Sequence, residues 1–188
     1  MSEEMNSLFR AGTVSIIFQA LAIVGVIIYN HLVFVDYLHV LSAAMWVGGN
    51  VFMGIIFYRL IKTLPQGDQV DISRRLLPLT LFFLPSISVT TIITGVDLLS
   101  RLEAFVPLGI RLAVYSLAGV LLLISLLGLL PNSLYIYRGF SKSTYDAGFI
   151  IRKSLSNFRL CLIQSIIQVM MIGIMVYIVV VLIPSSSI

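Results

Sequence analysis

Five long apolar stretches restrict what this chain can fold into. They cover residues 13–30, 33–60, 76–99, 107–130 and 160–183. A helix needs about 20 mainly apolar residues to cross a bilayer's hydrocarbon core. Of the 188 residues, 59% are hydrophobic and only 11% are charged, which excludes an ordinary soluble domain of this length.

The stretches lack the period-2 alternation that a membrane β-barrel requires. The sequence therefore predicts an all-α fold, a polytopic membrane helical bundle with five transmembrane helices in a single domain over residues 1–188. We expect residues 33–183 to form the bundle and the first helix to attach at its periphery. The connection between the first two stretches consists of Asn30 and His31 and is long enough only for a tight turn. The first two helices should therefore form an antiparallel hairpin.

The positive charges predict the orientation. Ten of the 12 Lys and Arg residues lie before the first stretch, around the second connection or around the fourth connection. The positive-inside rule then places the N-terminus in the cytoplasm and the C-terminus outside. The net charge of +4 suits loops that face an anionic leaflet, and we expect no nucleic acid as a partner. The first stretch follows acidic residues and lacks a cleavage site, so we expect a retained helix.

Residues 131–157 mix cations with aromatic side chains. This mixture is typical of a segment at the headgroup layer, and it predicts a cytoplasmic interfacial loop that is partly helical from Ser143 onward. The alternative is a plain cytoplasmic linker with interfacial aromatics. The composition as a whole suits a multi-pass protein of a prokaryotic cytoplasmic membrane.

Residues 37–49 place His39, Trp46 and the pair Gly48-Gly49 in the second stretch. A seven-residue step returns to nearly the same helix face, so His39 and Trp46 should point the same way. A neutral imidazole is a common ligand for haem iron or copper, and small neighbours leave room beside it. The alternative for His39 is a hydrogen bond to a neighbouring serine or aspartate without any metal.

The string His39-x6-Trp46-x-Gly48-Gly49, in a helix that ends with basic residues, resembles the CopD-like membrane proteins, including copper-resistance protein D and the HemJ type of protoporphyrinogen oxidase. The match covers residues 36–62. It implies a helical core with haem b or copper bound at the matching histidine, His39. The helix face that His39 shares with Trp46, flanked by Gly49, would then lie beside the cofactor. The chain has no further intramembrane histidine, so the resemblance carries over one ligand only.

Methionines on the fifth stretch are candidates for a second ligand. Met171 and Met175 share a helix stripe, and thioether sulfur suits Cu(I) and haem iron. The alternative is that this stripe packs in the core, as methionines at helical spacing usually do.

Asp97 is embedded in the apolar run at the end of the third stretch, and Arg101 follows it by one helical turn. The simpler interpretation is an ion pair of Asp97 with Arg101 or with Arg111. The functional interpretation is that Asp97 orients His39 or relays protons from outside.

Two functions remain open. The first is an integral membrane subunit of a larger redox or respiratory assembly, such as a terminal oxidase. We expect such a subunit to have no catalysis of its own and to contact the lipid bilayer and other membrane subunits through the second, third and fifth helices. The alternative is an electron-transfer protein that binds haem b or a copper-handling protein, with His39 as the ligand. No Ser/His/Asp set, HExxH motif or nucleotide-binding loop indicates an enzyme.

Overall fold

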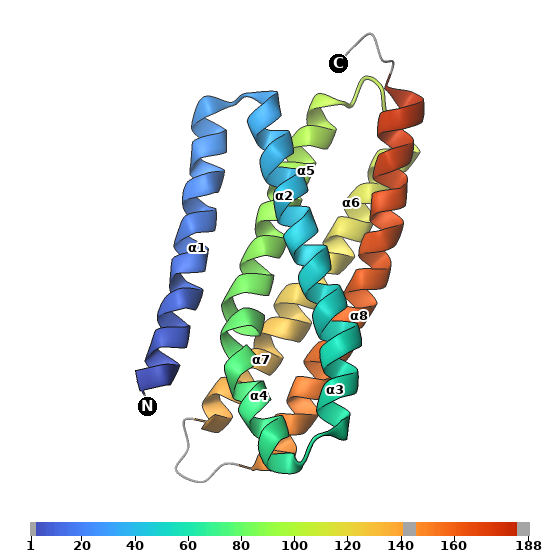
Figure 1. Cartoon of the computed structure of the whole chain (residues 1–188). Helices are drawn as coiled ribbons and strands as arrows, with labels where there is room; N and C mark the ends of the chain where they lie inside the picture. Colours follow the sequence, from blue (N-terminus) through green and yellow to red (C-terminus); the bar gives the residue numbers. More distant parts are fainter. Residues whose placement is uncertain (1–2, 141–145, 184–188) are drawn as a thin grey trace.

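The computed structural model describes residues 3–140 and 146–183, and all of its elements are helices (Figure 1). Five helical rods are long and apolar enough to cross a membrane, which fits a multi-pass membrane protein. The two ends of the bundle carry opposite termini, with the N-terminal end of the first rod at the bottom and the end of the fifth rod at the top. The predicted helical membrane bundle is confirmed, and its orientation stays a prediction.

The rods are built as follows. The first is α1 (Glu3–Tyr29). The second joins α2 (Leu32–Val51), η1 (Phe52–Phe57) and α3 (Tyr58–Thr63). The third joins α4 (Gln66–Pro78), η2 (Leu79–Phe83) and α5 (Leu84–Arg101). The fourth joins α6 (Leu108–Leu123), η3 (Ile124–Leu129) and α7 (Leu130–Phe140). The fifth joins α8 (Ala147–Tyr177) and η4 (Ile178–Leu182).

The η segments are π-helical turns, and each rod after the first contains one. In such turns the backbone hydrogen bonds span five residues, one more than in an α-helix, and they are frequent at functional sites. In the third rod the turn lies between Pro78 and Pro85, whose rings carry no amide hydrogen and so interrupt the usual bonding pattern.

Short connections determine which rods are neighbours. Asn30, with a positive φ of 44°, and His31 form the whole connection between α1 and α2, as expected. The His31 side chain accepts a hydrogen bond from the Val33 amide and caps α2. Leu64 and Pro65 separate the second and third rods, so the third rod begins ten residues earlier than the stretch predicted from residue 76.

The segment predicted as an interfacial loop at 131–157 is helical over residues 131–140 and 147–157, and its placement at the headgroup layer stays a prediction. The structure continues the fourth rod through Phe140 and begins α8 at Ala147, while residues 141–145 lie outside the described part. The cause is tertiary packing. Ile136 and Ile150 are buried with Leu77 and Leu81 of the third rod, so the aromatic and apolar residues of this segment form a helical face that closes the lower end of the bundle.

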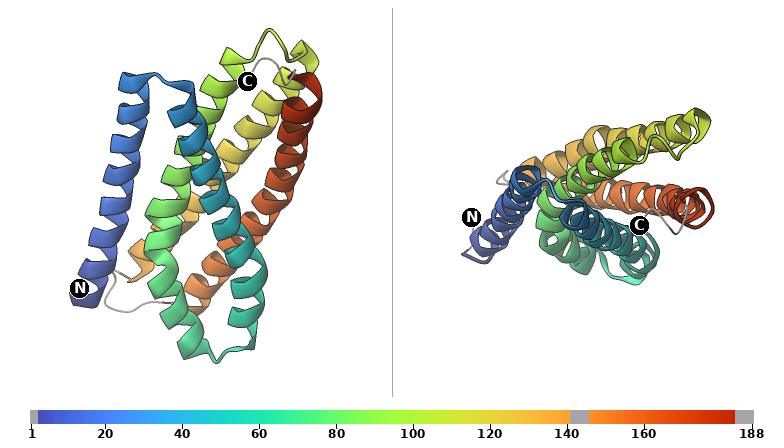
Figure 2. Two further views of the ribbon diagram at one scale, coloured as in Figure 1. Left: turned by 45° about the horizontal axis from the view of Figure 1, so that its top comes forward. Right: turned by 90° about the horizontal axis from the view of Figure 1, so that it is seen from above.

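The first rod lies at the edge of the bundle, as expected, and the views agree on this placement (Figures 1 and 2). Only 11% of its apolar window is buried inside the protein, against 56% for the third rod. The third rod is therefore the centre around which the others pack. Its upper part, α5, lies along α2, and this contact positions the candidate site.

Candidate functional site

His39 faces α5 and uses one ring nitrogen to hold that helix. Its Nδ1 lies 3.0 Å from the Thr91 carbonyl oxygen and 3.2 Å from Thr94 Oγ1. A carbonyl oxygen can only accept, so the proton of the neutral ring belongs on Nδ1. The lone pair then lies on Nε2, for which the described residues supply no hydrogen-bond partner. This arrangement is the one by which proteins orient a histidine that binds a metal.

Gly95 provides the space in which the imidazole lies. A Cβ built on Gly95 would be 2.7 Å from Cε1 of His39, closer than real Cβ contacts. Any side chain at position 95 would therefore displace the ring. The backbone hydrogen bond and the missing Cβ together determine where the imidazole sits.

A chain of hydroxyl groups extends the His39 site. Ser42 donates to the His39 carbonyl at 3.0 Å, and Thr91 Oγ1 donates to Ser42 Oγ at 2.9 Å. One turn away, Thr90 donates to Gln19 of α1 at 3.2 Å. Gln19 is buried, although most of α1 is exposed. Gln19 was not predicted as a site residue, and its signal is a long amide side chain in an otherwise apolar stretch.

Trp46 and Gly49 lie deeper in the bundle than His39. Trp46 is 3% exposed and packs in the main core with residues of all rods except the first, including Met53, Leu84 and Leu121. Gly49 faces Leu84, which would lie 3.1 Å from an added Cβ. Both residues therefore contribute to the packing between the second and third rods. This packing accounts for a flat tryptophan ring and a glycine at these positions.

A polar network occupies the middle of the bundle. Asn50 Nδ2 donates to Gln164 Oε1 and to Gln168 Oε1, each at 3.1 Å, which joins the second rod to the fifth. Gln164 Nε2 donates to Ser125 Oγ at 2.8 Å and to the Leu121 carbonyl at 3.0 Å, which adds the fourth rod. All of these side chains are buried. Such interhelical hydrogen bonds hold transmembrane rods in register.

Three buried atoms around this network lack partners within the described residues, namely Trp46 Nε1, Asn50 Oδ1 and Gln168 Nε2. They amount to two donors and one acceptor. Buried water molecules bond to groups of this kind, so the chemistry here suits an ordered water. Gln164 and Gln168 were not predicted as part of a polar network, although two amide side chains in one apolar stretch are a signal for it.

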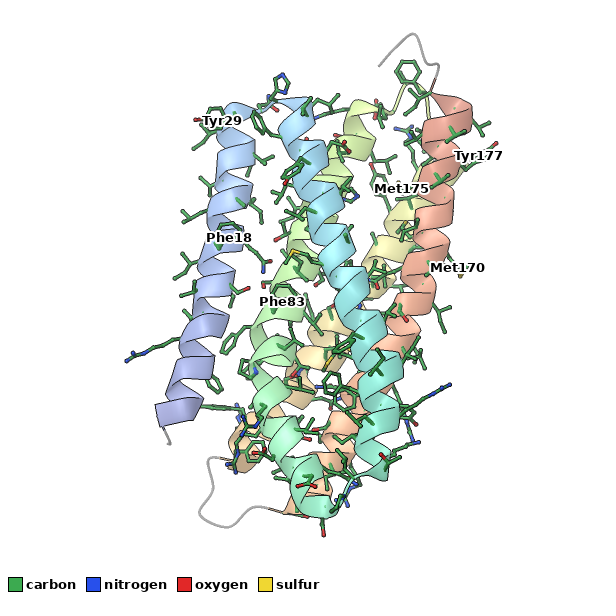
Figure 3. All side chains as sticks on the ribbon, viewed as in Figure 1. Phe18, Tyr29, Phe83, Met170, Met175 and Tyr177 are labelled. Atoms are coloured by element: carbon green, nitrogen blue, oxygen red, sulfur yellow. The ribbon has the colours of Figure 1, made fainter. Side chains whose placement is uncertain are left out.

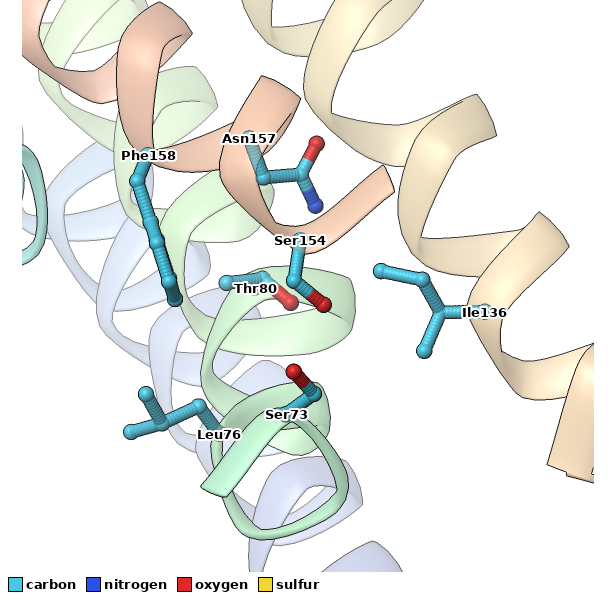
Figure 4. A pocket seen from close by; sticks show the side chains of 7 residues that line it. All are labelled: Ser73, Leu76, Thr80, Ile136, Ser154, Asn157 and Phe158. Carbon is cyan, nitrogen blue, oxygen red and sulfur yellow. The ribbon is translucent and has the colours of Figure 1, made fainter. Parts of the chain in front are cut away.

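A polar pocket lies at the lower end of the bundle, between the third, fourth and fifth rods. Figure 4 shows the hydroxyl groups of Ser73, Thr80 and Ser154 pointing toward one another. Asn157 of the same pocket donates to Ser133 at 2.9 Å. Ser154 Oγ and Asn157 Oδ1 have no partner in the part of the chain that the structure describes, so this pocket also suits a water molecule.

The methionines proposed as ligands pack elsewhere. Met171 and Met175 border a cluster made of Leu99, Val106 and Ile178 together with Val114. Figure 3 shows Met175 on the side of α8 that faces α6. No hydrogen bond among the described residues joins either sulfur to His39. The structure thus places both methionines in core packing.

Asp97 is engaged by Arg101, at 3.0 Å. Arg101 also donates to Asn30 Oδ1, so this pair ties the end of α5 to the turn between α1 and α2. Arg111 pairs with Glu103 at 2.8 Å. His39 is oriented by Thr91 and Thr94, not by Asp97.

The donor set available to a metal is small. Within the described ranges, no group of three or more His, Cys, Asp or Glu side chains could hold an ion. Cys161 is buried in the core, where it packs as a small apolar side chain. The chemistry of His39 therefore suits one ligand to a metal or haem. Any further ligand would have to be something other than a nearby His, Cys, Asp or Glu of the described residues.

Comparisons with family models, with curated proteins and with solved structures found no match to this chain.

Proposed function

We propose that the chain is an integral membrane subunit of a larger redox assembly, such as a respiratory terminal oxidase, and has no catalysis of its own. The observation that carries the proposal is a lipid-facing side of α2 on which Ala44 and Gly48 lie one turn apart, both exposed. A Cβ added to Gly48 would meet no atom within 4 Å. Small residues four apart allow a second helix to approach closely in a membrane.

The chain uses the same device internally. Gly54, further along the second rod, lies so close to α8 that an added Cβ would be 2.6 Å from the Leu162 amide nitrogen. The exposed pair Ala44 and Gly48 offers a comparable surface for close helix packing, and no part of the described chain covers it. A helix of another subunit is the occupant we propose. The resemblance of residues 36–62 to CopD-like proteins supports the link to redox chemistry.

The test is co-purification from native membranes in mild detergent. We expect the tagged chain to bring down other integral subunits that carry a redox-active cofactor, visible in the absorption spectrum. Gly48→Leu places a bulky side chain on this contact surface, so most of these subunits should no longer co-purify with the chain. Gly173→Leu is the matched control, since Gly173 is also exposed with open space around it but stands between Val169 and Tyr177. A chain that purifies alone, or equal behaviour of the two variants, contradicts the proposal.

A second candidate function is ligation of haem b or copper by His39, for electron transfer or copper handling. It is supported by the Nδ1 hydrogen bond to the Thr91 carbonyl, which leaves the Nε2 lone pair available. When bound, haem or copper would supply one-electron chemistry. His39 would bind the haem or copper, and Thr91 and Thr94 would hold its imidazole ring in place.

The two candidates are separated by spectra and metal analysis of the isolated chain. His39→Ala should remove a Soret band or bound copper if His39 is a ligand. His31→Ala is the control, because His31 is exposed and caps α2. Absence of both signals in the isolated wild-type chain counts against the ligand function.

A further inference from the structure

Two cationic side chains from different rods meet on one tyrosine at the lower end of the bundle. Lys62 Nζ donates to the Tyr58 hydroxyl oxygen at 2.8 Å, and Arg159 Nε donates to the same oxygen at 3.2 Å. Both cations also lie near the ring face, 4.1 Å and 5.8 Å from its centroid. Two positive charges are thus held close together around one neutral group.

The packing of the rods brings these residues together. Gly54 lies against the backbone of Leu162, so the second and fifth rods approach closely at this level. Tyr58 follows Gly54 by one helical turn, and Arg159 precedes Leu162 by nearly one turn. The contact at Gly54 therefore places Tyr58 beside Arg159, where α3 runs alongside α8 (Figure 1).

Within the described ranges, no acidic side chain forms an ion pair with either of these cations. The ion pairs found among the described residues involve Arg75, Arg101, Arg111 and Arg152, and none involves Lys62 or Arg159. Lys62 and Arg159 are both exposed, so an anion from outside can reach them. An anion placed between them would relieve their mutual repulsion.

An apolar wall rises directly above the two cations, toward the middle of the bundle. Ile55 lies one turn from Tyr58 on the second rod, and Ile163 lies one turn from Arg159 on the fifth. Their side chains are 41% and 47% exposed. Ile166 and Met170 continue the exposed apolar surface along α8. A polar cluster under an exposed apolar wall has the layout of a lipid, with its headgroup below and its acyl chain above.

We propose that Tyr58, Lys62 and Arg159 bind the phosphate of an anionic phospholipid, with an acyl chain along Ile55 and Ile163. Two uncompensated cations favour a headgroup of net negative charge over a zwitterionic one, in which a choline or ethanolamine group offsets the phosphate. The apolar wall favours a lipid over free phosphate, because only a lipid buries apolar surface there. This site is independent of the His39 site and of the surface at Gly48.

The experiment measures lipid retained by the purified full chain by native mass spectrometry. Phosphatidylglycerol and phosphatidylcholine with the same acyl chains are added in separate arms, and inorganic phosphate is added in a third. We expect phosphatidylglycerol to be retained, phosphatidylcholine to be retained far less, and millimolar phosphate to leave retention unchanged. Equal retention of the two lipids, or displacement of phosphatidylglycerol by phosphate, overturns the proposal.

Variants locate the site. The double variant Lys62→Gln with Arg159→Gln should lose at least about tenfold in phosphatidylglycerol retention, since each cation near an anionic lipid contributes about a factor of several to binding. The pair Lys62→Arg and Arg159→Lys keeps both charges and should keep most of the retention. The control Arg10→Gln with Arg138→Gln removes two other exposed cations, which lie on the first and fourth rods. An equal loss in this control would show a general charge effect and overturn the site.

Discussion

The first and third rods have almost the same mean hydropathy and opposite positions in the protein. Their apolar windows average 2.1 and 2.0, yet 11% of the first and 56% of the third are buried. The difference lies in the small polar residues of the third rod. Ser88, Thr90, Thr91 and Thr94 are all buried on α5, whereas Gln19 is the buried polar residue found on the described part of α1. In a membrane, polar side chains mark the protein interior and uniformly apolar faces meet lipid.

The largest effect should come from a glycine inside the bundle. Gly54→Ala places a Cβ 2.6 Å from backbone of α8, which cannot move aside as a side chain could. We expect a loss of about 1–3 kcal/mol in the free energy of unfolding, measured by titration of mixed micelles with dodecyl sulfate. Gly25→Ala on α1 is the control, since a Cβ there meets nothing within 4 Å. Similar losses in both would break the contrast between interior and lipid-facing helices.

The next effect should come from the central polar network. Asn50→Leu removes both donated hydrogen bonds, to Gln164 and to Gln168, at similar side-chain volume. We expect a loss of about 1–2 kcal/mol, because interhelical hydrogen bonds in membranes contribute about 0.6 kcal/mol each and at most about 1.7. A double-mutant cycle with Gln164→Leu isolates the pair. Strictly additive losses would show that the two side chains do not interact.

A smaller effect is expected where α1 joins the bundle. Gln19→Leu removes the hydrogen bond from Thr90 and should cost about 0.6 kcal/mol. Its predicted signature is increased hydrogen exchange in α1 with little change in α5. Phe18→Leu, at a side chain that is 71% exposed, serves as the control and should leave exchange unchanged. If exchange rose equally in α5, the first rod would be more than a peripheral element.

The smallest effect is expected at the exposed ion pair. Arg101→Gln removes the contacts to Asp97 and Asn30 at the upper end of α1 and α5. Exposed pairs contribute little, so we expect a loss below about 1 kcal/mol that shrinks further at high salt. Unfolding measured at two salt concentrations checks this. A larger loss that does not depend on salt would mean that the turn at Asn30 anchors the hairpin.

Much of the fold could be predicted from hydropathy alone. The five rods and the turn at Asn30 and His31 follow from the lengths of the apolar stretches and their short separation. The ends of the rods could not be predicted in this way. Hydropathy indicates which residues suit the lipid interior, and a helix can continue beyond them. The third and fourth rods extend beyond the apolar core as α4 and α7, held by the packing of Ile136 and Ile150 on Leu77 and Leu81.

The candidate site was predicted only in part. The sequence singled out His39 and Trp46, yet it could not show that Nδ1 binds the Thr91 carbonyl, because that contact joins residues 52 apart in the chain. It predicted Met171 and Met175 as possible ligands, and the structure packs both against the cluster at Leu99. The lipid site depends on a contact between the second and fifth rods that no local pattern marks.

The sequence by itself determined that this chain forms membrane-spanning helices, because apolar length and the need to satisfy every backbone hydrogen bond within lipid leave few other solutions. The tertiary structure decided which helix lies at the centre and which polar atoms meet. Those outcomes depend on close approach at single positions such as Gly54 and Gly95, where the absence of one Cβ lets two distant segments come into contact.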